Sequence, residues 1–251
     1  EAADVLRRGG ARVLVTATDF LDTDLPALLE GADLPALEIT VILSGPVPGG
    51  AVAHGDVLAS GSPVDAEEVA RRIAALTADD PADILFTSGT TGAPKGVVQT
   101  QGRTLLVATD WTVMTGLTAG DRYLMVNPYF HMFGLKAGIL ASVVAGATMY
   151  PEPVFDVVRV LTRVEQERIT VLPGAPTIYQ SILDHPERDR HDLSSLRVAV
   201  TGASTIPPVL IEAFLSAEDK DFYSHGGIAI DGPDVDDHRD LADERAEPQL
   251  V

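Results

Sequence analysis

Short apolar runs rich in β-branched residues alternate along the chain with segments whose apolar residues recur at helical spacing. Strands are predicted at 12–16, 38–43, 83–87, 123–126, 169–172 and 196–200, with extended chain at 148–150. Helices are predicted before residue 12 and at 25–29, 65–76, 104–114, 133–144, 154–167 and 176–183. Such alternation predicts an α/β fold, in which helices cover parallel sheets.

Two segments lack a regular pattern. The glycine- and serine-rich segment from 45 to 63 is predicted to be a surface loop. Beyond about Ser216 apolar residues become sparse and acidic residues crowd the chain, which is the composition of disordered segments. We therefore divide the chain into a folded domain at 1–205 and a poorly ordered acidic tail at 206–251, which a protease should remove first.

Composition excludes several classes of partner. The formal net charge of −19 argues against nucleic acids and anionic membranes, because both would be repelled. The absence of cysteine excludes disulfides and thiolate metal sites, and no residue is assigned as a metal ligand. No secretory leader is visible, so a cytoplasmic location is expected. The apolar stretch at 132–150 contains Lys136, Ser142 and three glycines, which favours a buried helix and a strand over a membrane span.

The segment 86–96, Phe-Thr-Ser-Gly-Thr-Thr-Gly-Ala-Pro-Lys-Gly, has the chemistry of a phosphate-binding loop. Its glycines let backbone N–H groups approach an anion, its hydroxyls donate hydrogen bonds, and Lys95 adds a cation. A short run that we expect to be a buried strand precedes it. It is not a Walker A loop, because Pro94 precedes the lysine and Gly96 follows it. The alternative is a solvent-exposed turn with an incidental lysine.

This segment resembles the signature loop of the adenylate-forming enzymes, which include acyl-CoA synthetases, luciferases and the adenylation domains of peptide synthetases. The resemblance implies that the loop handles the β- and γ-phosphates of ATP while a carboxylate attacks. We expect an open site between the strand end and the following helix, with Lys95 facing it. The matching residues are Thr87, Ser88, Gly89, Thr90, Thr91, Gly92 and Lys95.

Three later segments extend the resemblance. The segment 127–134, Asn-Pro-Tyr-Phe-His-Met-Phe-Gly, resembles the aromatic and histidine signature that lines the acyl pocket, although alone it could be apolar core. His131 would orient the carboxylate or gate the acyl tunnel. The stretch 171–179 resembles the next shared segment, where Ala175 and Tyr179 are candidate pocket residues. The turn after 197–201 would pack against adenine, through Gly202, Ala203 and Ser204.

Residues 130–201 are most similar to the actinobacterial acyl-CoA ligases that activate fatty acids and steroid-derived propanoates. This implies ATP, Mg²⁺ and CoA as cofactors and a small carboxylic acid as substrate, while the oligomeric state stays open. Similarity runs to about Pro208, so we expect no counterpart of the segments that hold adenine, ribose and magnesium or of the later catalytic lysine. The expected result is weak ATP binding and no acyl-CoA synthesis at a useful rate.

The segment 206–228 resembles instead the start of the peptidoglycan glycosyltransferase domain of penicillin-binding proteins, with Glu218 in the position of a general base. Three functions follow as alternatives. The first is an acyl-CoA synthetase or part of one, the second a non-catalytic nucleotide-binding module, and the third a glycosyltransferase fragment.

Overall fold

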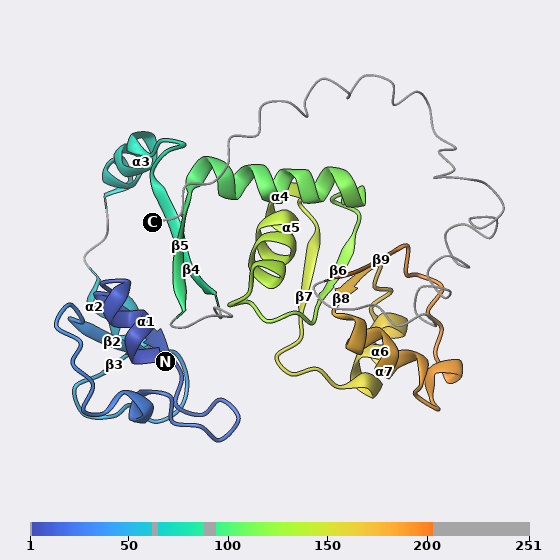
Figure 1. The fold of residues 1–251 in the computed structure, drawn as a ribbon, viewed down its shortest axis with the longest axis horizontal. Coiled ribbons are helices and arrows are strands. Elements are labelled where there is room, and N and C mark those ends of the chain that lie inside the picture. The colour runs from blue at the N-terminus through green and yellow to red at the C-terminus, as the bar shows by residue number, and fades with distance from the viewer. Residues whose placement is uncertain (1, 62–64, 88–93, 203–251) are drawn as a thin grey trace. The chain divides into compact units, whose positions relative to one another are not determined.

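The computed structural model describes residues 2–61, 65–87 and 94–202, which Figure 1 colours by position along the chain. These residues belong to two compact units. Of the described residues, one unit comprises those from Ala2 to Pro173 together with His191–Ala199, and the other comprises Gly174–Arg190 together with 200–202. The predicted tail at 206–251 lies outside the described residues, so the boundary at 205 and the resemblance around Glu218 stay predictions.

The N-terminal part of the first unit is a small parallel sheet in the order β1-β2-β3. Its elements are α1 (Ala2–Arg8), β1 (Val13–Thr16), the 3₁₀ turn η1 (Pro26–Leu29), β2 (Ile39–Ile42), β3 (Val52–Ala53) and α2 (His54–Ser60). The predicted loop at 45–63 is therefore wrong in part, because it contains β3 and α2. Pairing of Val52 and Ala53 with Val41 and Ile42 provides the strand, and local sequence does not reveal such long-range pairing.

An antiparallel hairpin follows α3 (Ala66–Ala75), whose N-cap Asp65 accepts a hydrogen bond from Glu67 N–H. The hairpin consists of β4 (Pro81–Thr87) and β5 (Lys95–Thr100). The strand predicted at 83–87 is confirmed, but its expected burial is wrong, and so is the expectation that a helix is the next element after the glycine-rich loop. No residue of β4 is fully buried, and Ile84 is 43% exposed. The strand β5, which contains the β-branched pair Val97-Val98, lies between the glycine-rich segment and the helix α4 (Gln101–Thr115).

The larger sheet has the order β7-β6-β8-β9, with β6 parallel to both neighbours. Its strands are β6 (Arg122–Met125), β7 (Thr148–Pro151), β8 (Val171–Gly174) and β9 (Val198–Thr201). The core beside it includes the fully buried Tyr123, Ala141 and Val171. Helices cover this core, and Figure 1 shows α4 and α5 next to each other, as their contacts require.

The connection from β6 to β7 is helical, as the sequence predicts. It consists of a π-helical segment, η2 (Phe133–Leu140), continued by α5 (Ala141–Ala145). The helix α6 (Val157–Gln166) links β7 to β8 and buries Val160, Leu161 and Val164. Among the described residues no helix is long and apolar enough to cross a membrane. The apolar run at 132–150 forms η2, α5 and β7 instead.

In the second unit, α7 (Pro176–Leu183) begins with a proline in its first turn, as expected, and a short 3₁₀ turn, η3, spans Arg188–Arg190. The Tyr179 hydroxyl donates a hydrogen bond to the carbonyl of Val200 at 3.1 Å. The α/β fold predicted from the sequence is confirmed, with the antiparallel hairpin as an addition.

Candidate functional site

The ends of the β4–β5 hairpin adjoin the glycine-rich segment. Thr87, the last residue of β4, pairs with Lys95, the first residue of β5, and both residues are exposed. Residues paired directly across antiparallel strands present their side chains on the same face. The Thr87 hydroxyl and the Lys95 ammonium therefore share one face at this end of the hairpin. The other matching residues of the predicted loop lie outside the described residues: Ser88, Gly89, Thr90, Thr91 and Gly92.

His131 lies at the turn between β6 and η2, with its side chain exposed. Its Nδ1 accepts a hydrogen bond from the backbone N–H of Phe133 at 3.1 Å, and the backbone N–H of His131 donates to the carbonyl of Pro128 at 3.1 Å. Because Nδ1 is an acceptor, the neutral imidazole carries its proton on Nε2. That N–H is a suitable donor to a carboxylate, which is the role that the sequence predicts for this residue.

Close backbone packing fixes the junction that carries His131. A Cβ added at Gly134 would lie 2.2 Å from the Pro128 carbonyl oxygen and 2.9 Å from that of Asn127. Glycine is therefore required for η2 to begin against this turn. The buried Asn127 side chain donates to the carbonyl of Pro173 at 3.0 Å, which ties the carboxyl ends of β6 and β8 together.

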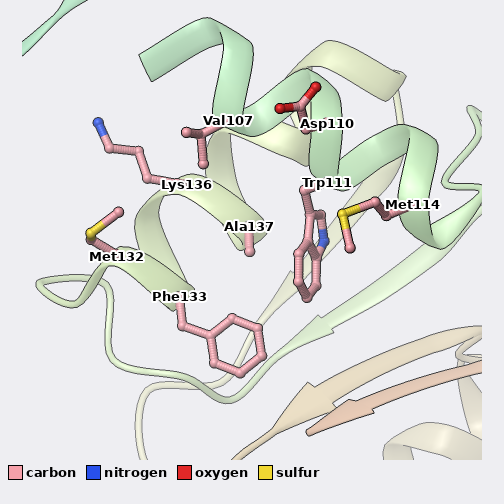
Figure 2. Close-up of a pocket in the computed structure, with 8 residues that line it drawn as sticks. All are labelled: Val107, Asp110, Trp111, Met114, Met132, Phe133, Lys136 and Ala137. Carbon is pink, nitrogen blue, oxygen red and sulfur yellow. The ribbon is translucent and has the colours of Figure 1, made fainter. Parts of the chain in front are cut away.

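A cavity of about 280 Å³ opens between α4 and η2. Figure 2 shows the side chains of Trp111 and Phe133 next to each other, and their rings meet edge to face with centroids 5.5 Å apart. Its walls are mainly apolar, and the lining residues are Val107, Asp110, Trp111, Met114, Met132, Phe133, Lys136 and Ala137. The sequence predicted both helices but not this cavity, because the spacing of apolar residues shows which face is apolar and not which neighbour covers it.

A second cavity, of about 560 Å³, lies at the carboxyl ends of β6 and β7, where α/β sheets commonly bind ligands. Segments 126–130 and 152–155 provide most of its lining. Within it, partial burial raises the pKa of the Tyr129 hydroxyl above its ordinary value. Glu152 is buried and its carboxylate accepts a hydrogen bond from Arg163 at 3.0 Å.

Lys136 is the residue of this region that the sequence interpretation missed. It is 1% exposed, and its Nζ donates to the Thr104 hydroxyl at 2.8 Å and to the Asp83 carboxylate. A lysine inside the apolar stretch 132–150 was the available signal, since buried lysines require partners. Neither partner could be assigned from the sequence, because 53 residues separate Asp83 from Lys136.

The remaining predicted residues are less informative. Gly202 follows β9, while Ala203 and Ser204 lie outside the described residues, so the adenine-binding role stays a prediction. Ala175 is the N-cap of α7, and Tyr179 lies within that helix. In the part of the chain that the structure describes, no group of three or more His, Asp or Glu side chains is placed to hold a metal ion.

Comparison with known proteins identifies the family whose sequences and structures this chain matches. A family model described as "AMP-binding enzyme" matches residues 1–229. The chain is 49% identical over 221 residues to the 3-[(3aS,4S,7aS)-7a-methyl-1,5-dioxo-octahydro-1H-inden-4-yl]propanoyl:CoA ligase of Mycobacterium tuberculosis, covering 88% of this chain and 43% of that protein. The Rhodococcus jostii protein of the same name is 44% identical over 222 residues, covering 86% and 43%.

Among solved structures, the anthranilate CoA ligase AuaEII in complex with anthranoyl-AMP superposes with a TM-score of 0.73 and 28% identity, covering 86% of this chain and 41% of that one. The chain thus spans less than half the length of the relatives that it matches. The family match extends over most of the sequence, and the two actinobacterial ligases agree with the subfamily predicted from residues 130–201. The chain belongs to the AMP-binding enzyme family.

Proposed function

We propose that this chain contributes to the ATP-dependent activation of a carboxylic acid, as an acyl-CoA synthetase. The carboxylate would attack the α-phosphorus of ATP to give an acyl-adenylate and pyrophosphate, and the thiol of CoA would then displace AMP. The observation that carries the proposal is the pairing of Thr87 with Lys95, which sets a hydroxyl and a cation beside the glycine-rich segment in a member of this family.

The described residues suit the two ends of this reaction. Lys95 is exposed at the end of the hairpin, where it can stabilise the negative charge that develops on departing pyrophosphate. His131 presents Nε2–H as a donor to the substrate carboxylate, because its Nδ1 is engaged by Phe133 N–H. The apolar cavity beside Trp111 suits the hydrophobic body of an acid. Mg²⁺ would arrive with the phosphates, and it commonly binds through phosphate oxygens and few carboxylates.

The acid itself is proposed at the level of a class. Two relatives are named for a propanoyl group on a fused-ring ketone, and a structural neighbour is an anthranilate ligase. We therefore propose a hydrophobic carboxylic acid, with a propanoate on a fused ring as the first candidate. CoA as the acceptor and a cytoplasmic location belong to the same proposal.

Pyrophosphate release by the purified 251-residue chain tests this function. Mg·ATP labelled at the γ-phosphate is incubated with a panel of acids, in wild type and in Lys95→Ala. The proposal expects slow release, below the rate useful for acyl-CoA synthesis, that depends on both the acid and Lys95. Arg12→Ala is the matched control, because it removes one exposed positive charge from the separate β1–β2 sheet, where Arg12 pairs with Glu38 at 2.8 Å.

Two other outcomes favour the alternatives. ATP binding without acid-dependent release would indicate a non-catalytic nucleotide-binding module. Activity on a lipid-linked sugar, without any response to ATP, would indicate the glycosyltransferase suggested by the segment 206–228.

A further inference from the structure

A buried cation joins three elements around the first cavity. Lys136 belongs to η2, and its ammonium group contacts Asp83 of β4 and Thr104 of α4. The Lys136 side chain is 1% exposed, whereas that of Asp83 is 21% exposed. The same Lys136 Nζ therefore bonds to the strand before the glycine-rich segment and to the helix that follows β5.

The aliphatic part of the same side chain is also a wall of the cavity. Lys136 lines the cavity together with Trp111 and Phe133. Figure 2 shows its ammonium group directed away from both aromatic rings, while its stem remains beside Met132. One side chain thus contacts the cavity with its carbons and β4 with its charge.

Because Lys136 is buried, its bonds to Asp83 and Thr104 are costly to break. An ammonium group withdrawn from water is strongly destabilising unless it keeps its partners, and breaking a buried pair on one side costs more than an exposed pair contributes. A displacement of η2 therefore has to carry β4 and α4 with it or break this bond. Asp83 lies four residues before Thr87, which is about 13 Å along an extended strand, so β4 can transmit such a displacement to the hairpin end.

We infer that Lys136 is a positioning residue that couples nucleotide binding at the Thr87–Lys95 end of the hairpin to acid binding in the cavity beside Trp111. Lys136 acts through Asp83 and Thr104 and touches no reacting atom. The inference rests on the proposed function, because it takes ATP and a hydrophobic acid as the two ligands. Coupling of this kind is reciprocal, so each ligand changes the affinity for the other by the same factor.

The fluorescence of Trp111, the chain's single tryptophan, reports on the cavity directly. Decanoate is titrated against the 251-residue chain with and without saturating α,β-methylene-ATP, whose bridging carbon prevents adenylation. In the wild type we expect the dissociation constant for decanoate to change by about five-fold or more. In Lys136→Met the change should fall below about two-fold. The coupling factor is a ratio of two constants, so it is insensitive to a uniform loss of affinity.

Two further variants separate coupling from folding and from loss of the cavity wall. Thr104→Val removes one acceptor of the Lys136 ammonium, changes no charge and leaves every residue that lines the cavity in place, so the coupling factor should also fall. Asp121→Asn is the matched control: its carboxylate is buried and ion-paired with Arg197, and neither residue lines the cavity. It should keep the wild-type factor.

The outcomes are distinct. Full coupling in both Lys136→Met and Thr104→Val would overturn the inference and leave the proposed function standing, as would a wild type that binds both ligands independently. If Lys136→Met fails to fold, Thr104→Val decides alone. A wild-type chain that does not bind the nucleotide analogue would refute the proposed function, and the inference would fail with it.

Discussion

Replacement of Gly134 by alanine should destabilise the protein markedly. The added Cβ would lie 2.2 Å from the Pro128 oxygen, 2.7 Å from its carbonyl carbon and 2.9 Å from the Asn127 oxygen. All three atoms belong to the backbone, and the Asn127 side chain is held by its bond to Pro173. An ordinary carbon–oxygen contact requires about 1 Å more than the shortest of these, so η2 must move away from the turn. Overpacking of this kind costs about 1–3 kcal/mol, and here the upper end is expected because no flexible side chain can yield.

Urea unfolding followed by circular dichroism measures this cost. A loss of about 3 kcal/mol should lower the urea midpoint by about 1 M or more. The matched control is Gly55→Ala in α2, where an added Cβ meets no atom within 4 Å. This variant should be stabilised by about 0.4–1 kcal/mol, since alanine restricts the unfolded chain. The reasoning is refuted if Gly134→Ala unfolds at the wild-type midpoint, or if the two variants shift in the same direction.

Two further predictions concern the larger sheet. Burial by itself would raise the pKa of Asp121, but hydrogen bonds from Arg197 and Thr170, both 2.7 Å long, outweigh it and hold this pKa well below its ordinary 3.8. Asp121 thus stabilises the fold above about pH 4 and loses this effect on acidification. Asp121→Asn should therefore lower the free energy of unfolding by about 1.5–3 kcal/mol at pH 7, and this free energy should depend less on pH below pH 4 than in the wild type, as measured by urea titrations at several pH values. An unchanged slope in acid would contradict this. The Tyr123 hydroxyl donates a hydrogen bond to the carbonyl of Ala137 at 2.8 Å, and Tyr123→Phe removes this donor. Thermal unfolding should show a loss of about 1–3 kcal/mol in the free energy of unfolding, and wild-type stability would count against the prediction.

Residue patterns predict those parts of this fold that depend on local sequence. The β-branched runs identify β1 and β2, an apolar run identifies β6, and amphipathic spacing identifies α6, whose buried face is Val160, Leu161 and Val164. The strand β5 was missed because glycine at 96 and polar residues at 99 and 100 weaken its pattern, whereas its pairing with β4 stabilises it. Pairing between distant strands depends on tertiary contacts that a local window does not contain.

The candidate site likewise contains some residues that could be predicted from the sequence and others that could not. Lys95 and His131 could be selected from the sequence because their chemistry is unusual for their surroundings and their segments resemble a known family. Lys136 could not be assigned a role, because its partners Asp83 and Thr104 lie 53 and 32 residues away in sequence. The cavity beside Trp111 also depends on how α4 and η2 pack, and helical periodicity does not determine which helices pack together.

The central claim is that this chain binds ATP through the segment between Thr87 and Lys95. Isothermal titration of the purified 251-residue chain with Mg·ATP tests it most directly, in wild type, Lys95→Ala and the Arg12→Ala control. A charge-assisted bond to phosphate contributes about 1.5–3 kcal/mol, so Lys95→Ala should weaken binding by about 10- to 100-fold while Arg12→Ala binds as the wild type does. Equal affinity in wild type and Lys95→Ala, or no heat of binding in the wild type, would contradict the account.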